Sequence, residues 1–460
     1  MVRVYSSEEG PRLKTPMRLI ALILLVCFSL CGQQASPRLV IISVDGLMSR
    51  TLRNAESLGL RLPNLIEFRD RGTMSEGLVG VFPTVTYPTH TTMVTGRYPA
   101  DHGIVSNTLF DPERKLYGAW YWYSELIKVP TLWEAANAAG LKTGAVGWPV
   151  TAGAAIDFNV PEYRAFRNED DILLFRSLPT PGLLRAFEKA RGAIKLDPGG
   201  HHDDLLSDMA AFVIETHKPH LMLVHLIDLD HDQHLHGPES RPALRTLENI
   251  DRAIGKLRKA VEHAGLAKDT RWIIVSDHGF FKVEKLFHPE AFLASMGLVG
   301  GADAGSWRVA VRNAGGCSAF VLKDPGDEEA KALVLRMLGE LKRDGGFGID
   351  RIIERDELQR MHAWPDAFAA LSMKEGWAAG SGRTGAWVTV SETTKGTHGY
   401  APGPEALDAT FMAFGPGIPA RRIARGRMID VAPTASRLLG LRMSELPGVD
   451  LLASPASTKP

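Results

Sequence analysis

Cysteine is scarce in this sequence. Only Cys27, Cys31 and Cys317 occur among its 460 residues. The first two lie in or beside an N-terminal apolar run, so a chain that loses this run keeps Cys317 alone and forms no internal disulfide. A small fold held together by disulfides is therefore excluded, and stability must come from a large buried core. We expect Cys317 to be a buried structural thiol.

Net charge is also missing, because Lys and Arg together number 53 and Asp and Glu together number 53. Proteins that bind nucleic acids normally carry a basic excess, so nucleic-acid binding is not expected. Internal repeats and long low-complexity segments are absent as well. Hydrophobic residues make up 45% of the chain, which is enough for a large globular core.

The N-terminal apolar run, Leu19–Leu30, is too short for a comfortable transmembrane span, which needs about 20 residues. Basic residues precede the run and small residues follow it. This order is typical of a secretory signal peptide, which we predict over residues 1–35. The mature protein would then be secreted or periplasmic, with no transmembrane span. A buried core helix and a lipid anchor on Cys31 are the alternatives.

Short apolar runs recur along the rest of the chain, bounded by turn residues and separated by amphipathic stretches. Such runs are typical of strands buried on both faces, as in a mainly parallel sheet. The alternation predicts an α/β fold with a doubly wound, mainly parallel central sheet and helices on both faces. The predicted strands are Leu39–Val44, Thr143–Val146, Leu221–Leu226, Trp272–Val275, Ala319–Leu322, Ala386–Val390 and Thr410–Phe414. The predicted helices include Pro130–Ala139, Leu244–Ala264, Glu328–Arg343 and Pro433–Leu439.

We predict one catalytic domain over residues 36–450, followed by a flexible tail over residues 451–460. The pattern is mixed at about residues 324–377, which predicts a small inserted subdomain there. In an open parallel sheet, ligands bind beyond the carboxyl ends of the strands. Residues of a functional site should therefore come directly after the apolar runs.

Acidic and histidine side chains follow several of these runs. Asp45 ends the first predicted strand, beside a glycine that lets the backbone turn. Asp230 and His234 are four residues apart, so a helical turn would point both the same way. Taken alone, each motif also fits a turn, a cap or a solvated loop.

Asp277 and His278 adjoin at another strand end, and His398 lies in a loop flanked by glycines. With the preceding motifs they supply three Asp and three His, enough to hold two ions with three ligands each. Such ligands suit Zn²⁺ and, less selectively, Mn²⁺ or another divalent ion. Two ions about 4 Å apart clamp the attacking and leaving oxygens of a phosphoryl group.

A segment dense in threonine and proline, Phe82–His90, precedes a predicted helix start at Thr91. Coordination to a metal lowers the pKa of a threonine hydroxyl and makes it a nucleophile. A helix N-terminus beside it would favour a phosphate anion. An ordinary turn with threonine caps is the alternative, and spacing alone does not choose among the threonines.

These motifs resemble the nucleotide pyrophosphatase/phosphodiesterase (type I phosphodiesterase) family of the alkaline phosphatase superfamily. The resemblance covers about residues 38–445. It is carried by Val44–Gly46, Pro83–His90, Val94–Pro99, His102–Ile104, Asp230 with His234 and Gly237–Pro238, Ser276–Gly279 and Thr397–Tyr400.

The resemblance implies a metal-dependent phosphodiesterase or nucleotide pyrophosphatase that acts on a small phosphoester or nucleotide. Thr86 would be the nucleophile of a double displacement that passes through a phospho-threonine. One Zn²⁺ would be held by Asp230, His234 and His398. The other would be held by Asp45, Asp277 and His278, with the oxygen of Thr86 completing it.

One departure bears on the substrate. The resemblance implies an Asn after the second proline, as a hydrogen-bond donor to a phosphate oxygen, and this sequence has Thr89 there. A lost donor of this kind costs roughly 10²–10³ in rate, so the preference between diester and monoester stays open. Tyr87 is expected to contact substrate. Trp120–Tyr123 and Trp148 are further candidates for stacking on a base, with core packing as the alternative.

Two other functions remain as alternatives. One is a phosphomonoesterase or phosphonate hydrolase of the same superfamily, and the other is a non-catalytic metal-binding protein with this fold. A sulfatase is disfavoured, because Cys317 is followed by Ser-Ala-Phe-Val and not by the pattern x-Pro-x-Arg.

Overall fold

The computed structural model describes Met1 and residues 37–453, apart from residues 117–118, 164–168, 197–199 and 300–306. The predicted signal peptide lies almost entirely outside the described residues, so secretion stays a prediction. Most of the predicted tail is outside them too. Within the described part of the chain, no helix has the length and apolar character needed to cross a bilayer.

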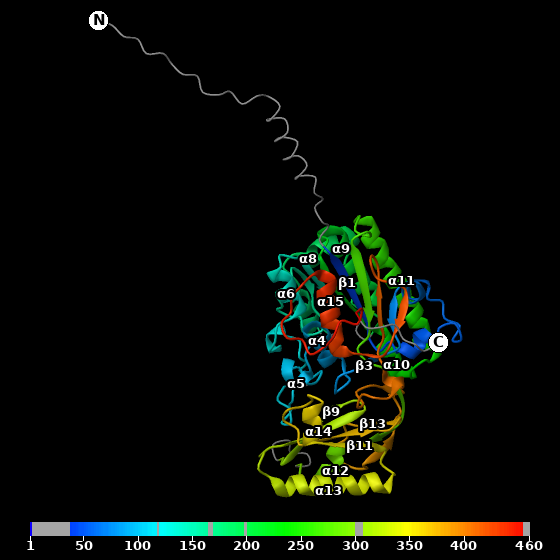
Figure 1. Ribbon diagram of the computed structural model, residues 1–460. Coiled ribbons are helices and arrows are strands. Elements are labelled where there is room, and N and C mark those ends of the chain that lie inside the picture. The colour runs from blue at the N-terminus through cyan, green and yellow to red at the C-terminus, as the bar shows by residue number, and fades with distance from the viewer. Residues whose placement is uncertain (2–36, 117–118, 164–168, 197–199, 300–306, 454–460) are drawn as a thin grey trace. The chain divides into compact units, whose positions relative to one another are not determined.

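An eight-stranded sheet lies at the centre of the described chain (Figure 1). Its strand order is β17-β2-β16-β7-β1-β6-β4-β5. Five neighbouring strands run parallel: β7 (Thr270–Val275), β1 (Arg38–Val44), β6 (Leu221–Leu226), β4 (Thr143–Val146) and β5 (Phe158–Val160). The other three are β16 (Phe411–Phe414), antiparallel to both its neighbours, β2 (Thr73–Ser75) and β17 (Arg421–Ile423). The predicted mainly parallel α/β architecture is confirmed.

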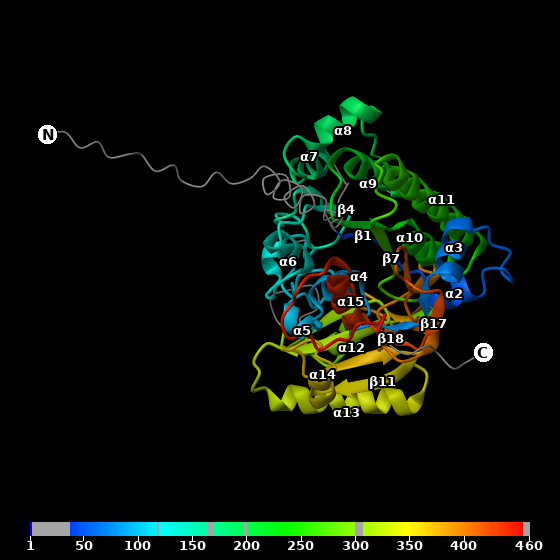
Figure 2. The ribbon, with the colours of Figure 1, turned by 45° about the horizontal axis from the view of Figure 1, so that its top comes forward.

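Helices cover both faces of this sheet. Val40, Ile42 and Val44 of β1 pack into a core shared with α3 (Pro63–Arg71), α9 (Asp203–His217) and α11 (Arg241–His263). Leu39 and Ile41 face the opposite core, shared with α4 (Thr86–Thr95), α6 (Leu132–Ala138) and α15 (Val431–Leu439). Figure 2 shows α9 and α11 on one side of β1, with α4 and α15 on the other. Burial on both faces explains why these strands are apolar throughout.

Shorter elements connect these layers. They are α2 (Ser49–Arg53), α5 (Pro99–His102), α7 (Glu169–Ser177), α8 (Leu183–Arg191), α10 (Asp228–His236), the paired strands β3 (Leu78–Val79) and β18 (Gly426–Arg427), and the 3₁₀ turns Ser124–Leu126, Glu405–Leu407 and Met428–Asp430. The predicted closing helix is present as α15. Gly440 follows it in the left-handed region at φ 67°, where glycine ends a helix without strain.

Between β7 and β16 the chain leaves the central sheet and builds two smaller ones. The first is antiparallel and consists of β9 (Val309–Ala314), β10 (Cys317–Leu322), β11 (Ile349–Glu354) and β12 (Ala369–Met373). In the second, β8 (Phe281–Phe287) pairs with β13 (Gly376–Ala379), β14 (Val388–Val390) and β15 (Gly396–Thr397). Helices α12 (Pro289–Ser295), α13 (Glu328–Asp344) and α14 (Arg355–Arg360) accompany them.

This off-sheet stretch is longer than the segment 324–377 that the sequence pattern suggested. Two of the predicted strands, Ala319–Leu322 and Ala386–Val390, fall in it as parts of β10 and β14, and not in the central sheet. The physical reason is that an apolar run reports burial and not which strand it will pair with.

Helix α4 begins at Thr86, five residues before the predicted start at Thr91. Pro88 therefore lies in the first turn of the helix. A proline is tolerated there because the first N–H groups of a helix have no acceptor within it. As a result, Thr86 is the first residue of a ten-residue helix.

Candidate active site

The carboxyl ends of three neighbouring parallel strands carry most of the predicted ligands. Val44 of β1 lies opposite Leu226 of β6, and Ser43 lies opposite Val275 of β7. Because these strands run in the same direction, the residues after each of them meet at one edge of the sheet. These residues include Asp45, helix α10 and the Asp277–His278 pair.

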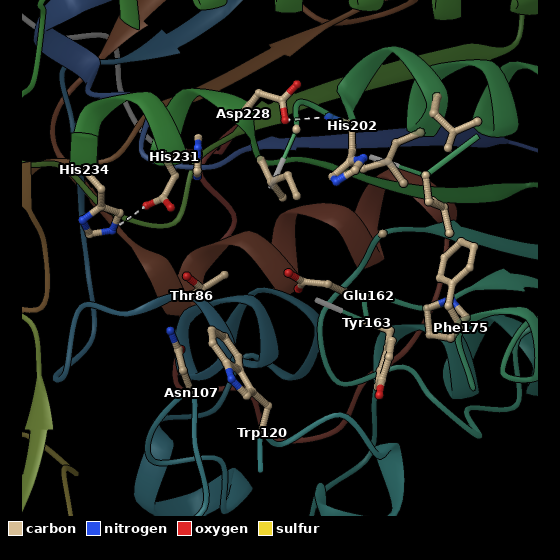
Figure 3. A pocket seen from close by; sticks show the side chains of 18 of the residues that line it. Thr86, Asn107, Trp120, Glu162, Tyr163, Phe175, His202, Asp228, His231 and His234 are labelled. Atoms are coloured by element: carbon tan, nitrogen blue, oxygen red, sulfur yellow. Dashed lines mark hydrogen bonds and ion pairs between the residues drawn. The ribbon is translucent and has the colours of Figure 1, made fainter. Parts of the chain in front are cut away.

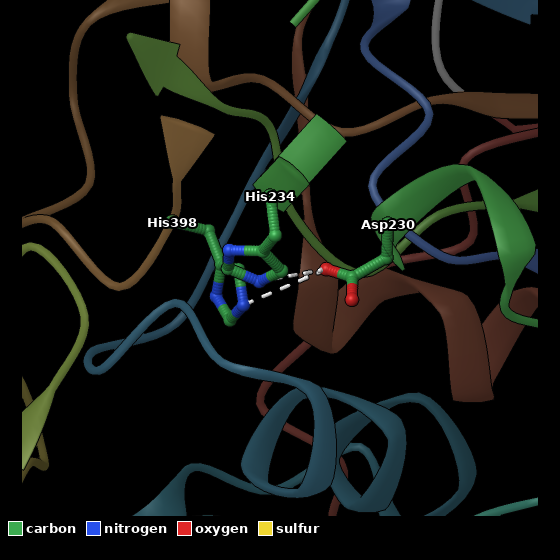
Figure 4. A group of neighbouring side chains, drawn as sticks. All are labelled: Asp230, His234 and His398. Atoms are coloured by element: carbon green, nitrogen blue, oxygen red, sulfur yellow. Dashed lines mark ion pairs between the residues drawn. The ribbon is translucent and has the colours of Figure 1, made fainter. Parts of the chain in front are cut away.

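Asp230, His234 and His398 form the first group (Figure 4). Asp230 and His234 lie one turn apart on α10, and His398 comes from the loop after β15. Asp230 Oδ1 is 3.4 Å from His234 Nε2 and 3.6 Å from His398 Nε2. One ligand atom of each residue lies within 4.8 Å of the other two, which is the spacing that a shared ion requires.

Backbone carbonyls orient both imidazoles of this group. His234 Nδ1 is 2.9 Å from the oxygen of Gly396, and His398 Nδ1 is 3.1 Å from the oxygen of Thr84. A carbonyl only accepts, so each Nδ1 carries the proton and each Nε2 presents a lone pair. Carbonyls hold metal-binding histidines in this way, since the hydrogen bond sets the tautomer.

Asp45, Asp277 and His278 form the second group, and all three are buried. His278 Nε2 is 3.3 Å from Asp45 Oδ1 and 3.1 Å from Asp277 Oδ2. The other carboxylate oxygen of Asp277 accepts from the backbone N–H groups of Gly46 and His278, each at 3.1 Å.

The two groups adjoin. Asp45, Asp230 and His278 also place one ligand atom each within 4.8 Å of one another. The imidazole rings of His278 and His398 stack with centroids 3.6 Å apart. The structure therefore brings together all six side chains that the sequence suggested as ligands.

The charges in the site suit divalent ions. Burial raises the pKa of Asp230, but the imidazoles of His234, His398 and His278 outweigh it and hold the pKa below its ordinary value. Burial likewise acts against ionised Asp277, and the His278, His90 and His225 imidazoles lower its pKa well below the usual range. Burial lowers the pKa of His398, which keeps that ring in the neutral form that binds metals. Three buried carboxylates are costly unless cations neutralise them, so the donor set fits two metal ions.

Thr86 lines a cavity of about 490 Å³ together with Asp230, His234 and His398 (Figure 3). As the first residue of α4, it places its hydroxyl at a helix N-terminus, where an anion is favoured. Its backbone oxygen accepts from His90 Nδ1 at 2.8 Å, and His90 Nε2 lies 2.9 Å from Ser43 Oγ. His90 thus ties the start of α4 to the end of β1.

Asn107 was not found from the sequence, because no motif surrounds it. It lines the same cavity as Thr86, and its Oδ1 accepts from the backbone N–H of Tyr87 at 2.9 Å. With the oxygen engaged, the amide nitrogen is directed toward Thr86, as Figure 3 shows. Thr89, the expected phosphate donor, is fully buried in α4 and is not among the residues that line the cavity.

Only some of the aromatic residues that were expected to contact substrate line the cavity. Tyr87 is 0% exposed and packs edge-on against Trp120 at 5.1 Å. Trp148 is also 0% exposed and packs against His90. Neither lines the cavity, whereas Trp120 and Tyr163 do. Tyr87, expected to contact substrate, therefore does not line the cavity, whereas Trp120, which packs against it, does.

The cavity continues away from Thr86 into a mostly apolar part. Glu162 and Asp228 lie at its wall, and no lysine or arginine is among the described residues that line it. Asp228 accepts from the backbone N–H groups of His202 and Asp203, at 2.9 and 3.0 Å. The apolar lining consists of Pro161, Phe175, Leu196, Leu205, Leu206 and Ile227.

Comparisons with known proteins point to one family. The family model of type I phosphodiesterase/nucleotide pyrophosphatase matches residues 39–401. Mouse ectonucleotide pyrophosphatase/phosphodiesterase family member 1 is 27% identical over 255 residues, which are 53% of this chain and 24% of that protein. The match thus spans about a quarter of the curated relative's length.

Solved structures show the same fold. Human ectonucleotide pyrophosphatase/phosphodiesterase 5 has a TM-score of 0.66 at 20% identity, covering 91% of this chain and 100% of that one. An inactive threonine-to-alanine variant of the murine protein, in complex with AMP, has a TM-score of 0.64 at 19% identity, covering 90% and 97%.

Proposed function

The chain belongs to the type I phosphodiesterase/nucleotide pyrophosphatase family, and on this basis we propose that it hydrolyses phosphodiester or pyrophosphate bonds through Thr86. The family predicted from the motifs is confirmed. The observation that carries the proposal is one cavity that joins Thr86, at a helix N-terminus, to the ligand group of Asp230, His234 and His398.

Two metal ions, Zn²⁺ by the character of the donors, would be held by the two adjoining groups of side chains. Bound there, they would supply Lewis acidity and lower the pKa of a nearby hydroxyl. The ligands would be Asp230, His234 and His398 for one ion, and Asp45, Asp277 and His278 with the Thr86 oxygen for the other.

The chemistry of the chain follows from these positions. The Thr86 oxygen loses its proton and attacks phosphorus, and the bond from phosphorus to the leaving oxygen breaks. Water then attacks phosphorus, the bond from phosphorus to the Thr86 oxygen breaks, and a proton from the water returns to Thr86 as the phosphate product leaves. Throughout, the amide of Asn107 and the N-terminus of α4 stabilise the negative charge that builds up on the phosphate oxygens.

The far part of the cavity favours an uncharged organic group on the phosphate. Its wall is apolar, Trp120 and Tyr163 offer aromatic faces, and Glu162 adds a negative charge. A second phosphate there would meet that charge without a lysine or arginine among the described lining residues. A nucleoside or another uncharged alcohol of the substrate would therefore occupy it. AMP in the murine neighbour supports a nucleotide.

A diester is favoured over a monoester for a related reason. A monoester phosphate carries one more negative charge, which a lysine or arginine commonly balances. We expect kcat/KM for bis-p-nitrophenyl phosphate to exceed that for p-nitrophenyl phosphate by about tenfold or more, the effect of about 1.4 kcal/mol. Purified, zinc-loaded protein assayed on both esters tests this. Faster turnover of the monoester would instead support the phosphomonoesterase alternative.

Asn107 and Thr89 can be separated as phosphate donors. We expect Asn107→Ala to lower kcat on a diester by about 10²–10³, because it removes a donor aimed at developing charge. Thr89→Val should change kcat by less than about threefold, because Thr89 is buried away from the cavity. Steady-state kinetics of both variants provide the measurement. The reverse order of effects would return the donor role to Thr89.

A further inference from the structure

His225 occupies the end of β6, between the two loops that follow the adjacent strands of the sheet. Strand β1 lies on one side of β6 and strand β4 on the other. Ser43 of β1 lies opposite His225 in the register, and Asp45 follows two residues further along the chain. On the other side, Gly147 follows β4. The side chain of His225 is fully buried between these loops.

Each ring nitrogen of His225 faces a different loop. Nε2 is 3.0 Å from Asp45 Oδ2, and Nδ1 is 3.1 Å from the backbone oxygen of Gly147. A carboxylate that binds metal is ionised and only accepts, so Nε2 donates to Asp45. The carbonyl of Gly147 also only accepts, so Nδ1 donates to it when both ring nitrogens carry a proton. Glu162 Oε2, at the cavity wall, lies 3.7 Å from Nδ1.

The two carboxylate oxygens of Asp45 thus contact different histidines. Oδ2 is held by His225, while Oδ1 lies 3.3 Å from His278 Nε2, within the ligand group. Asp45 follows the last residue of a strand, where the bonds of its side chain allow more than one orientation of the carboxylate. A donor on one oxygen fixes the direction of the other.

We propose that His225 is a positioning residue that orients Asp45 for metal binding. The inference rests on the proposed metal site, but not on the reaction carried out there. His90, whose ring lies 4.2 Å from that of His225, similarly holds the backbone of Thr86. Two buried imidazoles thus connect the ends of β1 and β6 to the ligand and to the nucleophile.

Two amide substitutions separate the contacts of His225. In His225→Gln, the amide nitrogen reaches about as far from the backbone as Nε2 does, so it can still donate to Asp45. In His225→Asn, the amide lies nearer the backbone, about where Nδ1 is, so it can reach Gly147 but not Asp45. Both variants keep a buried polar group in place of the ring, which makes them a matched pair.

The measurement is a competition titration of the full-length, metal-free protein with Zn²⁺ against a chromophoric chelator. We expect His225→Asn to weaken one of two zinc sites by about 10–100-fold, the usual effect of losing a partner of a metal ligand. His225→Gln should bind within about threefold of wild type. His236→Gln, at an exposed position of α10, is the control and should match wild type.

Thermal unfolding of the metal-free variants is measured in parallel. Equal zinc affinity of His225→Asn and His225→Gln would overturn the proposal, whatever the stability of the two variants. Zinc binding would then not depend on the hydrogen bond from residue 225 to Asp45. A wild-type chain that binds no zinc would overturn it together with the metal site. A wild-type chain that binds zinc but cleaves no phosphoester would reject the proposed function alone, and the comparison of variants would still decide the role of His225.

Discussion

Thr86→Ala is expected to lower kcat/KM for bis-p-nitrophenyl phosphate by about 10⁴-fold or more, with folding unchanged. Losses of this size are typical when the nucleophile of a covalent mechanism is removed. Thr86 is the only side chain in our proposal that forms a bond to phosphorus. The cavity, the ligand groups and Asn107 would remain, so substrate would still bind.

Two further threonine variants make this result specific. Thr86→Ser keeps a hydroxyl at the start of α4 and should retain much more activity than Thr86→Ala. Thr91→Ala, in the same helix, removes a hydroxyl that only bonds to the backbone oxygen of Tyr87 at 2.8 Å. Its activity should stay within a few-fold of wild type. Mass spectrometry of acid-quenched enzyme should find phosphate on Thr86. Wild-type activity in Thr86→Ala would remove this residue from the mechanism.

Removal of divalent ions is expected to have the second largest effect. Dialysis against a chelator should lower kcat/KM by about 10³-fold or more, because the ions supply several kcal/mol of transition-state stabilisation. Two equivalents of Zn²⁺ should restore activity, one for each group of three side chains. Activity and metal content measured along the same titration would test both the loss of kcat/KM and the number of ions per chain.

The metal-free protein should also unfold at a lower temperature. Its buried carboxylates then lack the cations that would offset the cost of burying their charge. A ligand that binds only the folded state, at 1,000 times its dissociation constant, stabilises that state by about 4 kcal/mol. Asp230→Asn is the matched variant, because Asp230 belongs to the first group and one of its oxygens also lies within 4.8 Å of ligand atoms of Asp45 and His278 in the second. Full activity after complete metal removal would contradict the two-metal proposal.

The pKa shifts set the direction of the pH dependence. The pKa values of Asp230 and Asp277 are lower in the folded protein than the ordinary 3.8. Their ionised forms therefore contribute stability above pH 4, and this contribution is lost as the pH falls through the folded-state values. His398 acts in the same direction on acidification, because its lowered pKa means that the unfolded chain takes up a proton first, and stability falls as the pH drops below the ordinary pKa of histidine.

Much of the candidate site could be predicted because its signals are local. Asp45, Asp230 and the Asp277–His278 pair each come within four residues of the end of an apolar run. Such runs identify buried strands, whichever sheet each strand joins. Parallel neighbours then bring these residues to one edge of the sheet. The family motifs pointed to Thr86 for the same reason, since they are continuous stretches of chain.

Other features depended on contacts between distant segments. Pattern could not show that Tyr87 and Trp148 are buried, that Asn107 lies beside Thr86, or that two of the predicted strands belong to smaller sheets. Each of these outcomes depends on which segment packs next to which, and an apolar or polar side chain looks the same in the sequence in either place.

The sequence by itself determined the family, the α/β architecture and the residues able to bind metal, because periodicity and short motifs are properties of consecutive residues. Only the tertiary structure decided which side chains face the cavity and which partners orient them. Asp45 and His225 are 180 residues apart, and their hydrogen bond exists because β1 and β6 are adjacent strands of one sheet.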